Sequence, residues 1–230
     1  MDRSTPVATN IPFVFVGCVE LREILGQRAE DEKELADLLA QVPSGSVYYH
    51  THGFFLRHRV FASTYTNDFA AWVVGEVRDP ILGEKLAMVD PFEFSDLEAL
   101  REELVSVMDH HLSQLRTVPR IDRGQPFDFL ESHVLELPIG LSAATLAEFR
   151  DDLAQVDASA IYFHLFEARV RMARQENDFS NWLRRELHLP DLADRVARIN
   201  PYVGSLERVR SRLLTLVDEA LEQNSGGAQS

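Results

Sequence analysis

Hydrophobic residues along this chain recur mostly at the spacing of an α-helix. One such stripe occupies positions i, i+3, i+4, i+7 and i+11, namely Ile161, His164, Leu165, Ala168 and Met172. Similar stripes predict helices over Ala29 to Gln41, Val47 to Arg59, and a long helix beyond Ser95. The pattern therefore predicts a mainly helical protein.

Two stretches depart from this spacing and favour extended structure. Phe13 to Val16 with Val19 to Leu21, and His133 to Leu137 further on, are rich in strand-forming residues. Because an isolated strand leaves its backbone groups unpaired, we expect the two stretches to pair in a small sheet. An ordered extended loop is the alternative. The predicted fold class is mainly α with a short β element.

The whole pattern occurs twice. The stretch Asn67-Asp68-Phe69-Ala70-Ala71-Trp72 returns as Asn177-Asp178-Phe179-Ser180-Asn181-Trp182, which is 177 − 67 = 110 positions later. Upstream the offset is 114, as from His50 to His164, and in the last helix it is 109, as from Leu97 to Leu206. Matching order and spacing over about a hundred residues indicate a tandem duplication.

The duplication predicts a domain organisation. Residues 1–116 form the first repeat, 117–125 a linker, 126–224 the second repeat, and 225–230 a disordered tail. We expect two pseudo-symmetric helical repeats that share a small sheet made from the N-terminal strand of each.

Local signals place several helix starts. Pro80 and Pro190 each open a helix at a position that proline tolerates. Ser95 with Glu98 has the spacing of a capping box, and Ser142 is the expected cap of the first long helix in the second repeat.

Composition narrows the classes of function. A net charge of −14 over 230 residues repels phosphates, so we expect no nucleic-acid partner. No apolar run is long enough to span a bilayer, so we expect no membrane insertion. Cys18 is the single cysteine, which favours a reducing cytoplasm. We expect an unknown protein partner and a monomer or homodimer.

Both repeats contain a histidine and a carboxylate that could act together in catalysis. His50 with Asp68, and His164 with Asp178, are weak candidates for an acid–base pair. A buried histidine also needs a hydrogen-bond partner, and the Asn-Asp turn can supply one. We favour this structural reading and assign no catalytic residue.

No motif for a metal or cofactor is recognisable. His50 and His52 lie on different faces of a helix, and no His-Glu-x-x-His pair occurs. Glycine-rich phosphate loops, dinucleotide fingerprints and nucleophile elbows are also missing from the sequence. We therefore expect neither a metal nor a cofactor.

The repeated aromatic and asparagine residues have a structural interpretation. Asn or Asp of each Asn-Asp pair should cap a short helix, and the aromatic rings lie at core spacing. The structural candidates are Asn67, Asn177, Phe69, Phe179, Trp72 and Trp182. An exposed aromatic recognition face is the alternative, and Trp72→Ala, which should cost about 3–5 kcal/mol if the ring is buried, separates the two.

Arginines concentrate in the second repeat. Their guanidinium groups suit phosphate or carboxylate, which makes an anion site a second hypothesis. The candidate ligands are Arg169, Arg171, Arg184 and Arg185. Solvated helix faces, or pairing with acidic residues of the first repeat, are the simpler reading.

The doubled order of Tyr-x-His, Asn-Asp-Phe-x-x-Trp and a helix ending in Asp-Pro or Asn-Pro resembles an uncharacterised prokaryotic family of domains of unknown function. The resemblance covers nearly the whole chain, and the Asn-Asp-Phe-x-x-Trp element is its most specific part. It implies no activity and transfers no catalytic residue.

Our leading hypothesis is a non-catalytic cytosolic interaction or regulatory module. A small-molecule or anion-binding domain is the alternative, followed by a hydrolase-like enzyme that uses a His/Asp pair.

Overall fold

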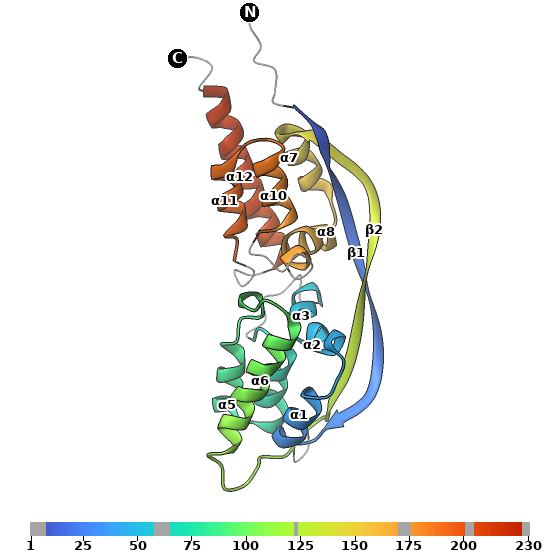
Figure 1. Ribbon diagram of the computed structural model, residues 1–230, viewed down its shortest axis with the longest axis vertical. Helices are drawn as coiled ribbons and strands as arrows, with labels where there is room; N and C mark the ends of the chain where they lie inside the picture. The colour runs from blue at the N-terminus through green and yellow to red at the C-terminus, as the bar shows by residue number, and fades with distance from the viewer. Residues whose placement is uncertain (1–7, 58–64, 122–123, 170–175, 201–204, 227–230) are drawn as a thin grey trace, which may run out of the picture. The chain divides into compact units, whose positions relative to one another are not determined.

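The computed structural model describes residues 8–57, 65–121, 124–169, 176–200 and 205–226. The chain is mainly helical, with one antiparallel sheet of two strands, β1 and β2, that lie side by side (Figure 1). The predicted fold class is confirmed at this level. Among the described helices, none combines the length and the apolar composition needed to cross a bilayer.

The two strands are far longer than the strand-forming runs in the sequence. β1 covers Ala8–Ala29 and β2 covers Phe127–Thr145. The two strands hydrogen-bond to each other, so pairing carries both strands through residues of low strand propensity. Gly26 and Gly140, which are 114 positions apart, both have a φ of +73°, a backbone conformation that glycine adopts without a Cβ clash.

The described residues divide into two compact units, which we call the first and second helical units. The first helical unit contains residues 20–57 and 65–135. Its elements are α1 (Glu32–Leu39), α2 (Ser44–His50), α3 (His52–Arg57), α4 (Asp68–Trp72), the π-helical turn η1 (Val73–Val77), α5 (Pro80–Ala87), the 3-10 turn η2 (Pro91–Glu93) and α6 (Leu97–Leu112).

The second helical unit contains residues 8–19 and the described residues from 136 onward. Its elements are α7 (Leu146–Gln155), α8 (Ala158–Tyr162), the π-helical turn η3 (Phe163–Glu167), α10 (Asp178–Arg185), α11 (Pro190–Ala197) and α12 (Leu206–Gly226). The division of the sequence at residues 116 and 126 stays a prediction, because these units are defined by packing and both strands contribute to each.

The aromatic residues at the start of each strand pack on helices of the other sequence repeat. Phe13 of β1 lies against Phe149 and Phe179, with ring centroids 5.5 and 5.2 Å away. Phe127 of β2 lies against Phe69, at 5.3 Å. Each helical unit therefore contains the first part of the strand that begins the other predicted repeat, an arrangement we call strand exchange.

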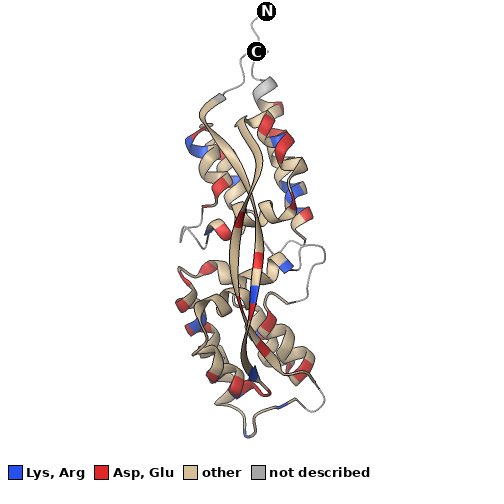
Figure 2. Cartoon of the chain, turned by 90° about the vertical axis from the view of Figure 1, so that its right-hand side faces the viewer, with Lys and Arg blue, Asp and Glu red and all other residues tan. Residues whose placement is uncertain are grey.

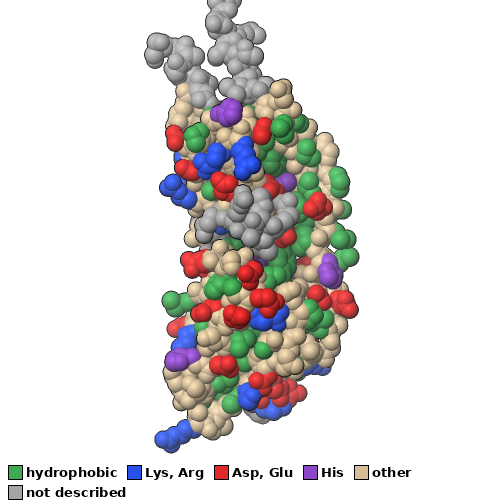
Figure 3. All heavy atoms as spheres, in the orientation of Figure 1, with side chains coloured by type: hydrophobic (Ala, Val, Ile, Leu, Met, Phe, Trp, Pro, Cys, Tyr) green, Lys and Arg blue, Asp and Glu red, His purple; other side chains and the backbone are tan. Residues whose placement is uncertain are grey.

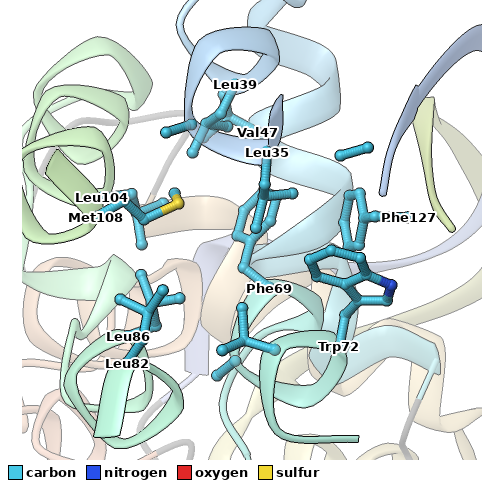
Figure 4. Packing of buried hydrophobic residues seen from close by; sticks show 14 of the residues in the cluster. Leu35, Leu39, Val47, Phe69, Trp72, Leu82, Leu86, Leu104, Met108 and Phe127 are labelled. Atoms are coloured by element: carbon cyan, nitrogen blue, oxygen red, sulfur yellow. The ribbon is translucent and has the colours of Figure 1, made fainter. Parts of the chain in front are cut away.

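The core of the first helical unit shows how this strand is held. Phe127 from β2 lies beside Phe69 and Trp72 of α4, while leucines of α1, α5 and α6 close the other sides (Figure 4). Phe69 is fully buried and Trp72 is 7% exposed. Burying rings of this size is the main apolar contribution to such a small core.

Helix starts partly follow the sequence signals. Pro80 and Pro190 are the first residues of α5 and α11, as predicted. The other two predicted caps were wrong. The side chain of Thr145, not Ser142, accepts the Glu148 amide in a capping box. Asp96, one residue beyond Ser95, caps α6. A carboxylate is a strong cap and Ser95 donates to it instead.

The helix predicted from Val47 to Arg59 is interrupted. α2 ends at His50 and α3 starts at His52, because Thr51 between them has φ −117° and ψ −82°. In the second helical unit the corresponding segment instead continues from α8 into η3. The predicted ends of these two segments, at Arg59 and Met172, lie in residues 58–64 and 170–175, which are outside the described residues.

Candidate functional site

His50 is held at both ring nitrogens. Its Nδ1 lies 2.9 Å from Oδ2 of Asp68, and its Nε2 accepts the backbone N–H of Leu130 in β2 at 3.1 Å. An Nε2 that accepts leaves the ring hydrogen on Nδ1, where it is donated to the carboxylate. Burial lowers the pKa of His50, and Asp68 opposes that effect. The imidazole is neutral and satisfied.

His164 repeats this geometry in the second helical unit. Its Nδ1 lies 2.9 Å from Oδ2 of Asp178, and its Nε2 accepts the backbone N–H of Val16 in β1 at 2.8 Å. Val16 and Leu130 are also 130 − 16 = 114 positions apart. Each candidate pair thus connects a helix, the start of α4 or α10, and a strand. Neither imidazole offers a free nitrogen to a substrate.

The Asn-Asp-Phe-x-x-Trp stretches position these pairs. Asn67 accepts the Ala70 amide and Asn177 accepts the Ser180 amide, so asparagine is the cap in both helices. The next residue, the aspartate, is thereby turned toward the histidine.

The two tryptophans bond to backbone just before the paired aromatics. Trp72 donates its indole N–H to the carbonyl of Gln125 at 2.7 Å, and Trp182 donates to that of Ile11 at 2.9 Å. Both rings are buried, at 7% and 6% exposed. They anchor the strands and do not form an exposed aromatic face.

Arg57 adds a cation to the first pair. It donates to Oδ2 of Asp68 at 2.5 Å and to the carbonyl of Tyr49 at 2.7 Å, and its guanidinium lies 3.8 Å from the centre of the Tyr49 ring. Arg57 also lies 3.5 Å from Glu20, whose pKa is raised by burial. Asp68 is shared between an imidazole and a guanidinium, as expected for a structural ion pair.

The described members of the predicted anion site, Arg169, Arg184 and Arg185, have different surroundings. Arg169 donates to the backbone carbonyls of Ala197 and Ile199. Arg184 pairs with Asp194 and Glu176. Arg185 lies apart from these, at a shallow hollow that also touches His164 and Asp178. Arg171 lies outside the described residues.

Other arginines of the second helical unit do gather. An open hollow of about 610 Å³ lies between α11 and α12. Its cationic lining is Arg195, Arg198, Arg208 and Arg212. Figure 3 shows blue side chains near one another on this unit. Arg169, Arg184 and Arg185 are not among the residues that line this hollow.

A second polar cluster was missed entirely. In the first helical unit, Glu32 begins α1, Asp79 caps α5 and His111 lies in the last turn of α6. Nε2 of His111 is 2.9 Å from Oδ2 of Asp79 and 3.9 Å from Oε2 of Glu32. Glu32 is fully buried, and burial followed by the charges of Asp79 and Asp31 raises its pKa to about 7.

A family comparison identifies the chain. The model of a family of unknown function, DUF5752, matches residues 10–218. The chain belongs to this family. The solved structure of OrfY from Thermoproteus tenax is similar, with 31% sequence identity, a TM-score of 0.77, and coverage of 93% of this chain and 97% of that chain. No curated protein matches. The resemblance expected from the sequence is thus confirmed, and it brings no activity with it.

The paired strands β1 and β2, which we call the ribbon, carry the largest group of exposed apolar side chains among the described residues. In the second helical unit the ribbon exposes Ile11, Val14, Val19 and Leu137, and in the first it exposes Leu21, Ile24 and Leu135. The other large apolar residues that are exposed in the described part of the chain are Ile81 and Met88. We call the seven strand residues the outer ribbon face. Figure 2 shows that most of the ribbon is uncharged, and Figure 3 shows green side chains along its edge.

Proposed function

We propose that this protein is a non-catalytic interaction or regulatory module of the cytosol that binds a partner protein through the outer ribbon face. We also infer that its helical units are two copies of one ancestral unit. Matched contacts support the duplication, since His50 and His164, and Trp72 and Trp182, make equivalent bonds 114 or 110 positions apart.

The observation that carries the proposal is the exposed aliphatic surface on β1 and β2. Ile24 is 73% exposed and Ile11 is 61% exposed, although strands normally bury such side chains. Exposing apolar area costs about 25 cal/mol per Å², so a concentrated group of this kind indicates a docking surface. The helices cover only the other face of the ribbon in each unit.

Charge favours one class of occupant. With a net charge of −14, a second copy of this chain would be repelled, whereas a basic partner would be attracted. The proposed partner therefore presents an aliphatic stripe flanked by lysine or arginine. The neutral, satisfied His50 and His164 support a role without catalysis.

The test uses two labelled peptides, one alternating valine with lysine and one alternating valine with glutamate. Fluorescence anisotropy should show binding of the lysine peptide alone. The double variant Leu21→Asp, Ile24→Asp should weaken it at least tenfold, because two exposed aliphatic contacts become charged. The matched control Ile81→Asp, Met88→Asp changes equally exposed residues outside the ribbon and should bind like the parent.

Three results would overturn the proposal. They are no binding of the lysine peptide, equal binding of both peptides, and equal weakening in the ribbon and control variants. Dimerisation of the parent that the ribbon variant abolishes, measured by sedimentation velocity, would replace the basic partner with a second copy.

The hollow between α11 and α12 favours a second candidate function, the binding of a small anion. Arg195, Arg198, Arg208 and Arg212 line it, and planar guanidinium groups suit phosphate oxygens. Pyrophosphate should raise the melting temperature of the parent protein. The rise should disappear in the double variant Arg198→Ala, Arg212→Ala. It should remain in Arg185→Ala, because Arg185 lies outside the hollow. An equal rise in all three proteins would exclude a defined site.

A further inference from the structure

Three elements of the first helical unit direct one side chain each to a common point. These are Glu32 from α1, Asp79 from the start of α5 and His111 from α6. One ligand atom of each lies within 4.8 Å of the other two. Two carboxylates and an imidazole from three separate helices are a set that binds metal ions in proteins.

Glu32 is the residue of this cluster that most directly indicates a bound cation. The residue is fully buried, and neither carboxylate oxygen has a hydrogen-bond partner among the described residues. Oε2 of Glu32 lies 3.9 Å from Nε2 of His111, and a carboxylate oxygen of Asp79 lies within 4.8 Å of Glu32. A buried carboxyl group without a partner is unfavourable unless a cation or proton satisfies it. The group needs a ligand that the described chain does not provide.

The corresponding positions of the second repeat are apolar. At the offsets of 114, 110 and 109 positions, Glu32, Asp79 and His111 become Leu146, Leu189 and Ala220. Leu189 is accordingly the N-cap of α11, and its side chain makes no capping hydrogen bond. The helical unit therefore forms with aliphatic side chains at all three places. The polar cluster is specific to the first copy and is not a requirement of the helical unit.

We propose that Glu32, Asp79 and His111 bind a divalent transition-metal cation of the Zn²⁺ class. An imidazole ligand favours such ions over Mg²⁺ and Ca²⁺, which prefer oxygen alone. Oδ1 of Asp79 accepts the amides of Ile81 and Leu82, which holds Oδ2 toward the cluster. This site is separate from the outer ribbon face and does not depend on the proposed function.

The geometry needs only small adjustments. Zn²⁺ ligands at about 2.0–2.2 Å in tetrahedral arrangement stand roughly 3.3–3.6 Å from one another. The distance of 2.9 Å between His111 and Asp79 must therefore lengthen slightly, and the distance of 3.9 Å between His111 and Glu32 must shorten slightly. Three protein ligands leave a fourth position for water. The side chain of Asp79 is 13% exposed and provides the route of entry.

The experiment measures Zn²⁺ binding to the metal-free full-length chain by calorimetry, with Co²⁺ absorption as a second readout. One equivalent should bind and raise the melting temperature. Glu32→Leu and His111→Ala introduce the residues found at the matching positions of the second repeat. Each should weaken binding at least tenfold, and Glu32→Leu should melt no lower than the metal-free parent because it removes the unsatisfied carboxyl group.

The control is His133→Ala. His133 belongs to an exposed group with Glu23 and Glu131 that has similar ligand spacing. This variant should bind Zn²⁺ like the parent. The proposal would be overturned by a parent that binds no Zn²⁺, by unchanged binding in Glu32→Leu and His111→Ala, or by binding that only His133→Ala removes.

Discussion

His50 and His164 show how a residue that looks catalytic can be part of the framework. Each imidazole donates to an aspartate at the start of a helix and accepts from a strand amide. If either ring were removed, a strand N–H would lose its acceptor and an aspartate would lose one hydrogen-bond donor. The residue types in the sequence could not separate this role from acid–base chemistry, since both need a histidine beside a carboxylate.

The tautomer of these rings is open to direct measurement. We expect both imidazoles to carry their hydrogen on Nδ1, because Nε2 accepts the amides of Leu130 and Val16. Nitrogen NMR of imidazole-labelled protein distinguishes the two ring nitrogens. A hydrogen on Nε2 of either ring, or exchange between tautomers, would contradict the structural role.

His52 should make stability depend on pH. Burial lowers its pKa to about 4 from an ordinary 6.5, so between these values the unfolded chain binds a proton that the folded chain excludes. The contribution of His52 to the free energy of unfolding should be complete above pH 6.5 and be lost as the pH drops toward 4, by up to about 3 kcal/mol. His50, whose pKa is also lowered, adds to the loss in the same direction. Glu32, whose pKa is raised to about 7, contributes in the opposite direction over this range, so a variant of His52 is needed to separate these groups. Urea unfolding at a series of pH values measures this dependence of the free energy of unfolding on pH.

A matched variant isolates the contribution of His52. Its counterpart in the second repeat is Phe166, at 166 − 52 = 114 positions, and that ring is also buried. His52→Phe should fold, and its stability relative to that of the parent should rise as the pH falls from 6.5 to 4. A variant with the same pH dependence as the parent would show that the pKa of His52 does not affect stability.

At the scale of elements, local signals predicted the helices better than their ends. The proline starts at Pro80 and Pro190 were correct because a missing N–H is harmless there. The caps at Ser95 and Ser142 were wrong because neighbouring polar residues compete, and only the chain direction in the fold decides between them. The strands were predicted too short, since their length comes from pairing and not from propensity.

Arg78 ends η1 in the left-handed region, with a φ of 67°, and its counterpart His188 has a φ of 55°. A side chain costs about 1 kcal/mol or more in this conformation, and glycine does not. Arg78→Gly should therefore raise the free energy of unfolding by roughly 0.5–1 kcal/mol. Arg198, the cap of α11, has a φ of −85°, so Arg198→Gly should lower it by a similar amount. Chemical denaturation measures both, and equal effects would show that Arg78 is unstrained.

At the scale of the whole molecule, the two compact units do not follow the order of the sequence repeats. Residues 8–19 belong with the helices of the second repeat, and residues 127–135 belong with those of the first. The sequence could not predict this exchange. Both repeats begin their strands with the same Pro-Phe-x-Phe pattern, so either set of helices offers the same pocket to either strand. Periodicity and composition are identical for the exchanged and unexchanged arrangements.

The cluster around Glu32 was missed for a related reason. The pattern that the two repeats share does not include this cluster, because the repeats differ at all three of its positions, Glu32, Asp79 and His111. A buried acidic residue where the other copy has leucine was the signal available in the sequence. The outer ribbon face was not recognisable, because exposure of Ile11 or Ile24 depends on which side of the strands the helices cover.

Strand exchange is the claim on which the account of both units depends, and hydrogen exchange tests it directly. Phe13→Ala should accelerate amide exchange in α10, because Phe13 packs on Phe179 and Trp182. Phe127→Ala should accelerate it in α4, because Phe127 packs on Phe69 and Trp72. If Phe13→Ala instead loosens α4 and Phe127→Ala loosens α10, each strand packs on the helices of its own repeat and strand exchange is refuted.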